Sequence, residues 1–183
     1  QAGIDFARLP EEQYDDPLGE STGAAVLFGA TGGVMEAALR TAYELLTGKE
    51  LPTLRFEPVR GLEGIKEATV EINGTPVRVA VAHSLGYARQ LLERVKAGEQ
   101  FHFIEIMACP GGCLGGGGQP IPTNTEIRAQ RMAGIYTADE RMVIRKSHEN
   151  PSIQALYREF LGRPLGEKSH HLLHTHYTAR SRY

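Results

Sequence analysis

Residues 68–82 read ATVEINGTPVRVAVA, two runs in which apolar and polar residues alternate. The runs lie on either side of Asn73 and Gly74, a dipeptide that favours a two-residue turn between antiparallel strands. The stretch therefore predicts a β-hairpin, and the neighbouring segments are interpreted outward from it.

The residues after the hairpin predict a helix followed by a strand. Apolar residues recur every three or four positions and line one face of a helix that ends before a glycine, Gly98. These residues are Leu85, Ala88, Leu92 and Val95. Residues 101–106 are mostly apolar and predict a strand that leads directly into the first cysteine.

The residues before the hairpin predict two strands and a helix. Residues 24–28 form a short apolar run ahead of a glycine-rich turn, which is typical of a buried strand. Apolar residues at helical spacing from Val34 onward predict a helix that Gly48 ends. Residues 54–60 predict a further strand.

The C-terminal part is predicted to be helical. Thr123 and Glu126 have the spacing of a capping box for a helix through about Met132. Asn150, followed by proline, predicts the start of a last helix that runs to about Leu161. Strands that alternate with helices indicate an α/β fold with a mainly parallel sheet flanked by helices.

The composition excludes several classes of protein. With 183 residues, 41% of them hydrophobic, the chain can bury a core without disulfides. A net charge of −2 gives no broad attraction to nucleic acid or anionic membranes. Since no apolar run approaches the roughly 20 residues of a membrane span, we expect a cytoplasmic protein. The chain begins with Gln1, so we also expect a fragment or a processed chain.

The strongest chemical signal is FHFIEIMACPGGCLGGGGQP, residues 101–120. Cys109 and Cys113 lie four residues apart among six glycines, which let backbone approach a bulky inorganic group. Thiolates suit iron because soft sulfur donates strongly to the metal. Spacing alone leaves a flexible glycine loop with incidental thiols, or a disulfide, open as well.

Four segments resemble those of iron-only (FeFe) hydrogenases. EIMACPGGCLGGGGQP is similar to the third cysteine signature of that family. The other three segments are FGATGGVMEAALR at 28–40, VRGLEGIKEA at 59–68, and a tail with RKSHEN at 145–150 and SHHLLHTHY at 169–177. The tail resembles the small-subunit-like extension at the end of many such enzymes.

The resemblance implies a domain organisation. Residues 1–125 would form the C-terminal lobe of a two-lobed domain that holds the active-site cluster, called the H-cluster. Residues 126–183 would form a helical, small-subunit-like extension. The two earlier cysteine signatures of the family and its ferredoxin-like N-terminal domains are absent from these residues.

The resemblance also assigns metal ligands. Cys109 would bind only a 4Fe-4S cubane, and Cys113 would bridge that cubane to a di-iron subcluster with carbonyl, cyanide and dithiolate ligands. A cubane normally needs four protein thiolates, so two more are expected from upstream sequence or a second chain. Additional iron-sulfur clusters are expected in the missing upstream part.

Four further residues would line the di-iron pocket. Met107 would face the dithiolate through its adaptable thioether, although the residue type alone is equally typical of a core methionine. Phe28, Gly29 and Val34 would form a wall that excludes water. The turn before the helix at Val34 would offer free amides to cyanide or another anion. It fits neither the dinucleotide-binding nor the P-loop pattern.

Two groups of polar residues are assigned no chemistry. Four tail histidines are expected to pack and hydrogen-bond rather than to bind a metal, namely His170, His171, His174 and His176. Four glutamates are expected on solvated faces, namely Glu36, Glu44, Glu67 and Glu71. No catalytic residue of a proton relay is assigned in this segment.

The activity implied for the complete subunit is reversible interconversion of dihydrogen with protons and electrons, the segment alone being inactive. The expected partners are the remainder of the catalytic subunit, flavin- and NAD-linked subunits and ferredoxin. Two alternatives stay open: a hydrogenase-like iron-sulfur assembly or sensory protein without ordinary hydrogen turnover, and a structural half-domain without metal. The segment at 28–40 and the histidine tail favour the enzyme.

Overall fold

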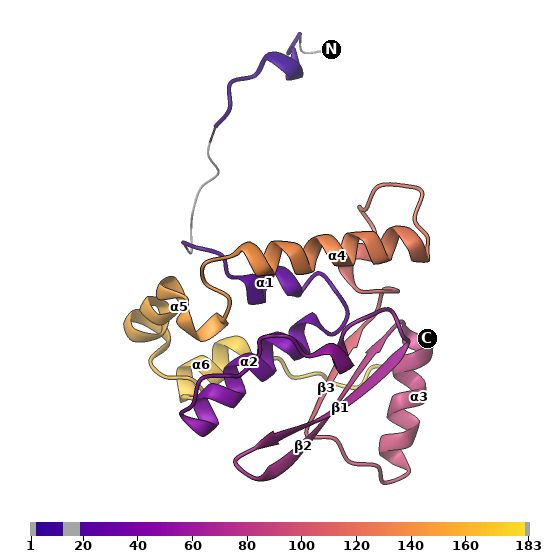
Figure 1. The fold of residues 1–183 in the computed structure, drawn as a ribbon, viewed down its shortest axis with the longest axis vertical. Coiled ribbons are helices and arrows are strands. Elements are labelled where there is room, and N and C mark those ends of the chain that lie inside the picture. The colour runs from indigo at the N-terminus through magenta and orange to yellow at the C-terminus, as the bar shows by residue number, and fades with distance from the viewer. Residues whose placement is uncertain (1–2, 13–18, 182–183) are drawn as a thin grey trace.

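The computed structural model describes residues 3–12 and 19–181 (Figure 1). Its strands are β1 (Ile65–Ile72), β2 (Thr75–His83) and β3 (Phe103–Met107). Its α-helices are α1 (Gly23–Leu27), α2 (Gly33–Thr47), α3 (Leu85–Lys96), α4 (Thr125–Arg141), α5 (Pro151–Leu156) and α6 (Glu167–Leu173), and a π-helical turn, Tyr157–Leu161, continues α5. Short 3₁₀ turns lie at Phe6–Arg8, Glu57–Val59, Cys113–Gly115 and Ser147–Glu149.

The three strands form one sheet in the order β1-β2-β3. β1 and β2 are antiparallel, and the turn between them contains Asn73 and Gly74, both with positive φ as a type I′ turn requires. The predicted hairpin is therefore confirmed. β2 and β3 are parallel, with His83 opposite Met107 at the end that leads to the cysteines. The α/β class is confirmed, and within the described sheet the pairing is mixed, parallel between β2 and β3 alone.

Helices cover both faces of the sheet. Val79 and Val81 of β2 pack against α2, whereas Ala80 and Ala82 pack against Leu91 of α3. Successive residues of a strand point to opposite faces, which explains why the central strand is an unbroken apolar run. Each buried valine or leucine contributes about 1.5–3 kcal/mol. The sheet is thus held firmly in the middle layer, with β3 along one edge.

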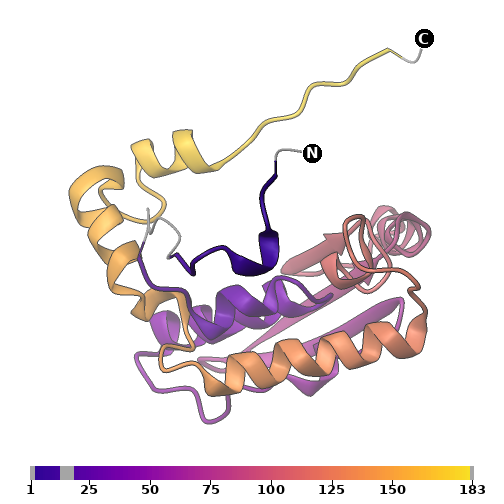
Figure 2. The ribbon, with the colours of Figure 1, turned by 90° about the horizontal axis from the view of Figure 1, so that it is seen from above.

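A further cluster of buried apolar side chains joins helix α4 to the residues around the cysteines. Ala30, Leu114 and Met132 form its buried centre, and Met132 comes from α4. Figures 1 and 2 show α4 running alongside α1. In Figure 2 the chain after α6 runs away from the rest of the molecule. No helix in the described ranges is long and apolar enough to cross a membrane.

Two strand predictions are wrong. Residues 24–28 lie in and just after helix α1, because the Thr22 hydroxyl accepts a hydrogen bond from the Ala25 amide (3.1 Å) and caps a helix there. A five-residue apolar run does not by itself distinguish a buried strand from a buried helix. Residues 54–60 contain only a 3₁₀ turn, consistent with Pro58, which cannot donate to a sheet ladder.

The helix predictions agree better with the structure. α2 ends at Gly48, which has φ 65°, and α3 ends before Gly98. The face predicted for α3 is partly wrong, since Leu85 and Leu92 are exposed while Leu91 is buried.

The C-terminal helices were predicted less completely. α4 is capped by Asn124, whose side chain accepts from the Ile127 amide (2.8 Å), and it continues to Arg141 instead of ending near Met132. α5 begins after Asn150 as predicted. It is not the last helix, because α6 follows it.

Candidate metal centre

Both cysteines lie in a tight loop directly after β3, here called the cysteine loop (residues 109–116). The Gly112 amide donates to the Cys109 carbonyl (3.0 Å), and Gly111 has φ +83°. Proline followed by glycine with positive φ is the pattern of a type II turn. Both thiols are free, that of Cys109 partly buried and that of Cys113 exposed.

The cysteine loop is bonded to the segment that precedes α2, here called the glycine turn (residues 29–33). The Leu114 amide donates to the Gly29 carbonyl (3.1 Å), and the Thr31 amide donates to the Gly111 carbonyl (2.9 Å). These two hydrogen bonds run in opposite directions between the segments. The loop and the turn therefore form one unit although they lie far apart in the sequence.

Glycine at 112 permits the close approach of these parts. A Cβ there would lie 2.8 Å from the Met107 sulfur, 2.8 Å from the Thr31 nitrogen and 3.0 Å from the Gly29 oxygen. No side chain fits into that space. The structure thus brings two of the predicted pocket residues, Gly29 and Met107, against the cysteine loop.

A cleft of about 370 Å³ lies beside the exposed cysteine. Gly29 and Cys113 line it together with side chains of α4, including Arg131 and Ile135. Phe28 follows the last turn of α1 and is 47% exposed. Val34 lies in the first turn of α2 and is partly buried. A role for these residues in a di-iron pocket stays a prediction.

The prediction that the glycine turn offers free amides is wrong. The carboxylate of Glu105, a buried residue of β3, accepts hydrogen bonds from the amides of Gly32 (2.6 Å) and Met35 (2.7 Å). The Gly33 amide donates to the Ala30 carbonyl (2.9 Å). A helix N-terminus favours an anion, and the anion at α2 is the chain's own carboxylate.

A buried lysine lies on the other side of the glycine turn. The Lys66 ammonium, on β1, donates to the carbonyls of Thr31 (3.0 Å) and Gly61 (2.8 Å). Burial lowers the pKa of Lys66 to about 8, an effect that the negative charge of Glu105 opposes. Burial likewise raises the pKa of Glu105, against the hydrogen bonds from the helix amides. The one sequence signal of this pair was Glu105, a charged residue within the strand predicted at 101–106, since Lys66 lies before the predicted hairpin.

A buried histidine, His83, is hydrogen-bonded to the cysteine loop. Its Nδ1 accepts a hydrogen bond from the Gly111 amide (3.1 Å), and its Nε2 lies 3.1 Å from the Leu62 carbonyl. Since the amide can only donate and the carbonyl can only accept, the neutral ring carries its proton on Nε2. The sequence did not predict this role, because a histidine at the end of the run VAVAH gives no sign of its distant partners.

The prediction that Glu36 is solvated is wrong. Its side chain is almost completely buried and accepts hydrogen bonds from Arg40 (2.7 Å) and Arg60 (2.6 Å). Arg40 also bonds Asp139 of α4 (2.7 Å), which Arg145 contacts from the other side. The buried charged side chains of α2 and α4 are thus paired with opposite charges inside the protein.

The prediction is also wrong for Glu44, whose side chain is 14% exposed and bonds the Lys146 ammonium (2.7 Å). Glu44, His148 and Glu149 lie close enough together to suggest a metal site. The Lys146 ammonium already bonds Glu44 and Glu149, so its positive charge takes the place that a metal ion would have between these carboxylates.

The other polar groups lie on the surface. Glu67 and Glu71 are exposed, as predicted. The expectation that the tail histidines pack and hydrogen-bond is mostly wrong: all four are exposed, and the described contact is the stacking of the His170 and His174 rings, with centroids 4.3 Å apart.

The donor set of the cysteine loop fits half of an iron-sulfur cubane. Two free thiols are held on a loop rich in glycine, and the Cys109 sulfur lies 3.4 Å from where a Cβ of Gly116 would be. Soft thiolates with little side-chain bulk around them suit a cluster larger than a single ion. Since the sequence has two cysteines, the remaining thiolates must be supplied from outside these residues.

Comparison with known proteins identifies two matched segments. The family model described as iron only hydrogenase large subunit, C-terminal domain, matches residues 1–117. A second, described as iron hydrogenase small subunit, matches residues 125–180.

Several relatives are similar over most of the chain. The chain is 57% identical, over 98% of its length, to the NADP-reducing hydrogenase subunit HndD of Solidesulfovibrio fructosivorans. It is 53% identical, over 79% of its length, to the periplasmic Fe hydrogenase large subunit of Nitratidesulfovibrio vulgaris. It is 35% identical, over 82% of its length, to the cytosolic iron-sulfur assembly component 3 of Rattus norvegicus. It covers 31%, 32% and 32% of these proteins, so it spans about a third of their length.

A solved structure gives the same result. An FeFe-hydrogenase of Chlamydomonas reinhardtii superposes with a TM-score of 0.71 at 48% identity, over 97% of this chain and 52% of that one. The first family model alone covers more than half of the chain, and its span includes the glycine turn and both cysteines. The chain therefore belongs to the family of iron-only hydrogenase large subunits.

Proposed function

We propose that this chain supplies two thiolates, Cys109 and Cys113, to the H-cluster of an iron-only hydrogenase. The complete subunit would reversibly interconvert dihydrogen with protons and electrons. The observation that carries the proposal is the pair of free thiols on a glycine-rich loop that is hydrogen-bonded to the glycine turn. When bound, the cluster supplies the electron transfer and the open iron site at which hydrogen reacts.

The residues of this chain would hold and enclose that cluster. Cys109 would bind the 4Fe-4S cubane, and Cys113 would bridge it to the di-iron subcluster. Gly29 and Met107 would face the di-iron unit, a role supported by their position within 3.0 Å of where a Cβ of Gly112 would lie. Phe28 and Val34 would complete the wall and exclude water. No residue of this chain is proposed to relay protons.

The proposed organisation follows the two matched segments. Residues 1–125 would form the cluster-binding lobe, and residues 126–183 the extension, which contains α4 apart from its first residue. Because Met132 packs with Ala30 and Leu114, the extension would share a core with the lobe. The remainder of the subunit would complete the cluster's ligands and carry further iron-sulfur clusters.

The proposed electron partners are flavin- and NAD-linked subunits or ferredoxin. The proposal is supported by a relative named as a subunit of an NADP-reducing hydrogenase. The cytoplasmic location stays a prediction, since another relative is named as periplasmic.

A second candidate is iron-sulfur assembly without hydrogen turnover. The 35% identity to the cytosolic iron-sulfur assembly component 3 favours it. The higher identity to hydrogenase subunits, 57% and 53%, favours the enzyme.

The test is Cys113→Ala in the complete, matured subunit. We expect hydrogen-dependent dye reduction and the infrared carbonyl and cyanide bands to disappear, because alanine cannot join the two parts of the cluster. The control is His174→Ala in the exposed tail, which should change the stability by no more than about 0.5 kcal/mol and keep both signals. A Cys113→Ala enzyme with substantial turnover would overturn the assignment. A wild-type subunit with an iron-sulfur cluster but neither turnover nor these bands would favour assembly.

A further inference from the structure

His83 is the last residue of β2, and the sheet holds it beneath the cysteine loop. Its side chain is almost fully buried, 7% exposed, and its backbone lies opposite Met107 in the parallel pairing with β3. The Ser84 amide donates to the Met107 carbonyl (2.8 Å). The imidazole is thus fixed at the point where the chain leaves β3 for the cysteines.

The ring joins two loops through opposite nitrogens. Nε2 donates to the Leu62 carbonyl, in the segment before β1, and this bond leaves the lone pair of Nδ1 directed at the Gly111 amide. Gly111 lies midway between Cys109 and Cys113. An acceptor at that point limits rotation of the turn that carries both thiols.

Among the residues that the structure describes, the only side chain that hydrogen-bonds to backbone between the cysteines is that of His83. The other hydrogen bonds of this segment run from backbone to backbone: from the Thr31 amide to Gly111, from the Gly112 amide to Cys109, and from the Gly115 amide to Gly112. A change of side chain at His83 therefore alters the support of the turn and leaves those contacts in place.

We propose that His83 is a positioning residue for the cluster site. Through the Gly111 amide it would set the direction of the Cys109 and Cys113 thiolates. This inference rests on the proposed function. Outer partners of metal ligands act in this way, and their loss typically costs about 10- to 100-fold in metal affinity.

The experiment compares three variants in the complete, matured subunit. His83→Leu keeps the bulk of the side chain and removes both hydrogen bonds. His83→Asn places an amide oxygen near the position of Nδ1, so it can still accept from Gly111.

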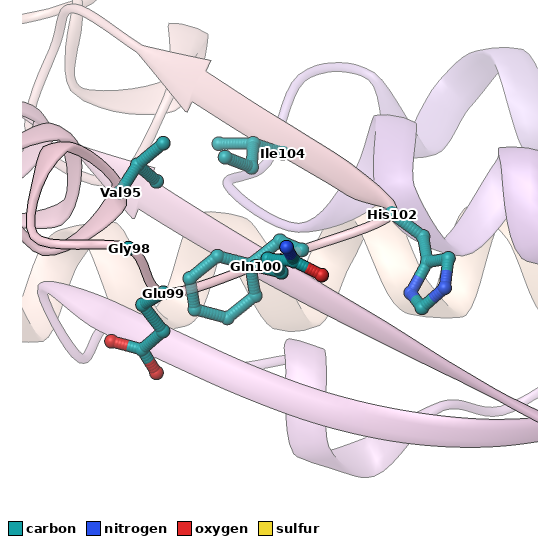
Figure 3. Close-up of a pocket in the computed structure, with 7 residues that line it drawn as sticks. Val95, Gly98, Glu99, Gln100, His102 and Ile104 are labelled. Carbon is teal, nitrogen blue, oxygen red and sulfur yellow. The ribbon is translucent and has the colours of Figure 1, made fainter.

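The third variant, His102→Leu, is the matched control. The Nδ1 of His102 accepts a backbone hydrogen bond from the Arg78 amide (3.0 Å), just before β3 and at the end of the strand far from the cysteines. His102 lines a cleft of about 400 Å³ together with Val95 and Ile104, and Figure 3 shows it at the far side of that cleft from these two residues.

The measurements are the electron paramagnetic resonance spectrum of the reduced cubane and the rate of iron loss to a chelator. For His83→Leu we expect a shifted spectrum and about 10- to 100-fold faster iron loss. His83→Asn should restore the wild-type spectrum and most of the iron retention, and His102→Leu should match the wild type in both.

Three results would overturn the inference while the proposed function stands: a His83→Leu protein identical to the wild type, a His83→Asn protein as altered as His83→Leu, or the same changes in His102→Leu. A wild-type subunit without any cubane signal would overturn the proposed function, and the inference with it.

Discussion

Arg40 is a buried cation that joins helix α2 to helix α4. Its side chain is fully buried and bonds Glu36 and Asp139. We predict that Arg40→Met lowers the free energy of unfolding by about 3–5 kcal/mol, because it leaves two buried carboxylates with fewer partners. Urea denaturation of the chain, followed by circular dichroism, measures this. The control is Arg55→Met, at a 57% exposed side chain, which should cost less than about 1 kcal/mol. Equal losses in the two variants would contradict the prediction.

Lys66 gives the stability a pH dependence. Its pKa in the folded chain is about 8, against an ordinary value of 10.5. Between these values the unfolded chain binds more protons, so the free energy of unfolding rises with pH. Relative to Lys66→Met, the wild type should gain up to about 3 kcal/mol across this window, at about 1.4 kcal/mol per pH unit.

Urea denaturation at several pH values between 8 and 10.5 measures the effect of Lys66. Lys96→Met, at an exposed lysine, serves as the control, and its difference from the wild type should stay flat. A flat difference for Lys66→Met as well would show that Lys66 is not desolvated.

The cysteines could be predicted from the sequence, but the residues that support them could not. The loop that carries Cys109 and Cys113 after β3 was predicted because the cysteine spacing, the glycines and the preceding strand are all local in the sequence. The role of the two cysteines as cluster ligands stays a prediction. Glu105 bonds an amide 73 residues away, and Arg40 bonds a carboxylate 99 residues away. No local pattern encodes such pairs, and a helix position such as that of Glu36 looks solvated until its partners are known.

At the scale of elements, prediction succeeded where local chemistry settles the structure. The turn at Asn73 and Gly74 and the cap at Asn150 depend on residues within a few positions, and both were found. The short helix α1 was missed because so brief an apolar run fits a strand as well as a helix, and the Thr22 cap that starts the helix was not recognised. α4 extends past its predicted end because Asp139, in its last turn, bonds Arg40 of α2.

The cysteine loop can be tested as an element by two glycine substitutions. Gly112→Ala forces a Cβ against the Thr31 nitrogen and the Gly29 oxygen at a residue with φ +96°. We expect it to separate the cysteine loop from the glycine turn and to abolish iron retention in the complete subunit. Gly117→Ala, at a position with nothing within 4 Å, is the matched control and should keep its iron. Iron content per folded protein is the measurement, and similar values for both variants would contradict the prediction.

At the scale of the whole molecule, the chain spans about a third of the length of its curated relatives. Under the proposed function it would supply two of the four thiolates that a cubane needs. We predict that the isolated chain, exposed to the maturation machinery, does not acquire a full complement of iron or the infrared carbonyl and cyanide bands. The complete subunit treated in parallel is the control. A full complement on the isolated chain would contradict the prediction.

Five amides of the cysteine loop are already engaged inside the chain. Those of Gly111, Gly112, Leu114, Gly115 and Gly116 each donate to an internal acceptor. An amide used in this way is not available to the sulfur of a cluster, where such donors stabilise the negative charge of the reduced state. These five amides would therefore give no hydrogen bonds to a cubane seated on this loop, which favours a lower reduction potential than the same loop would give if its amides were free.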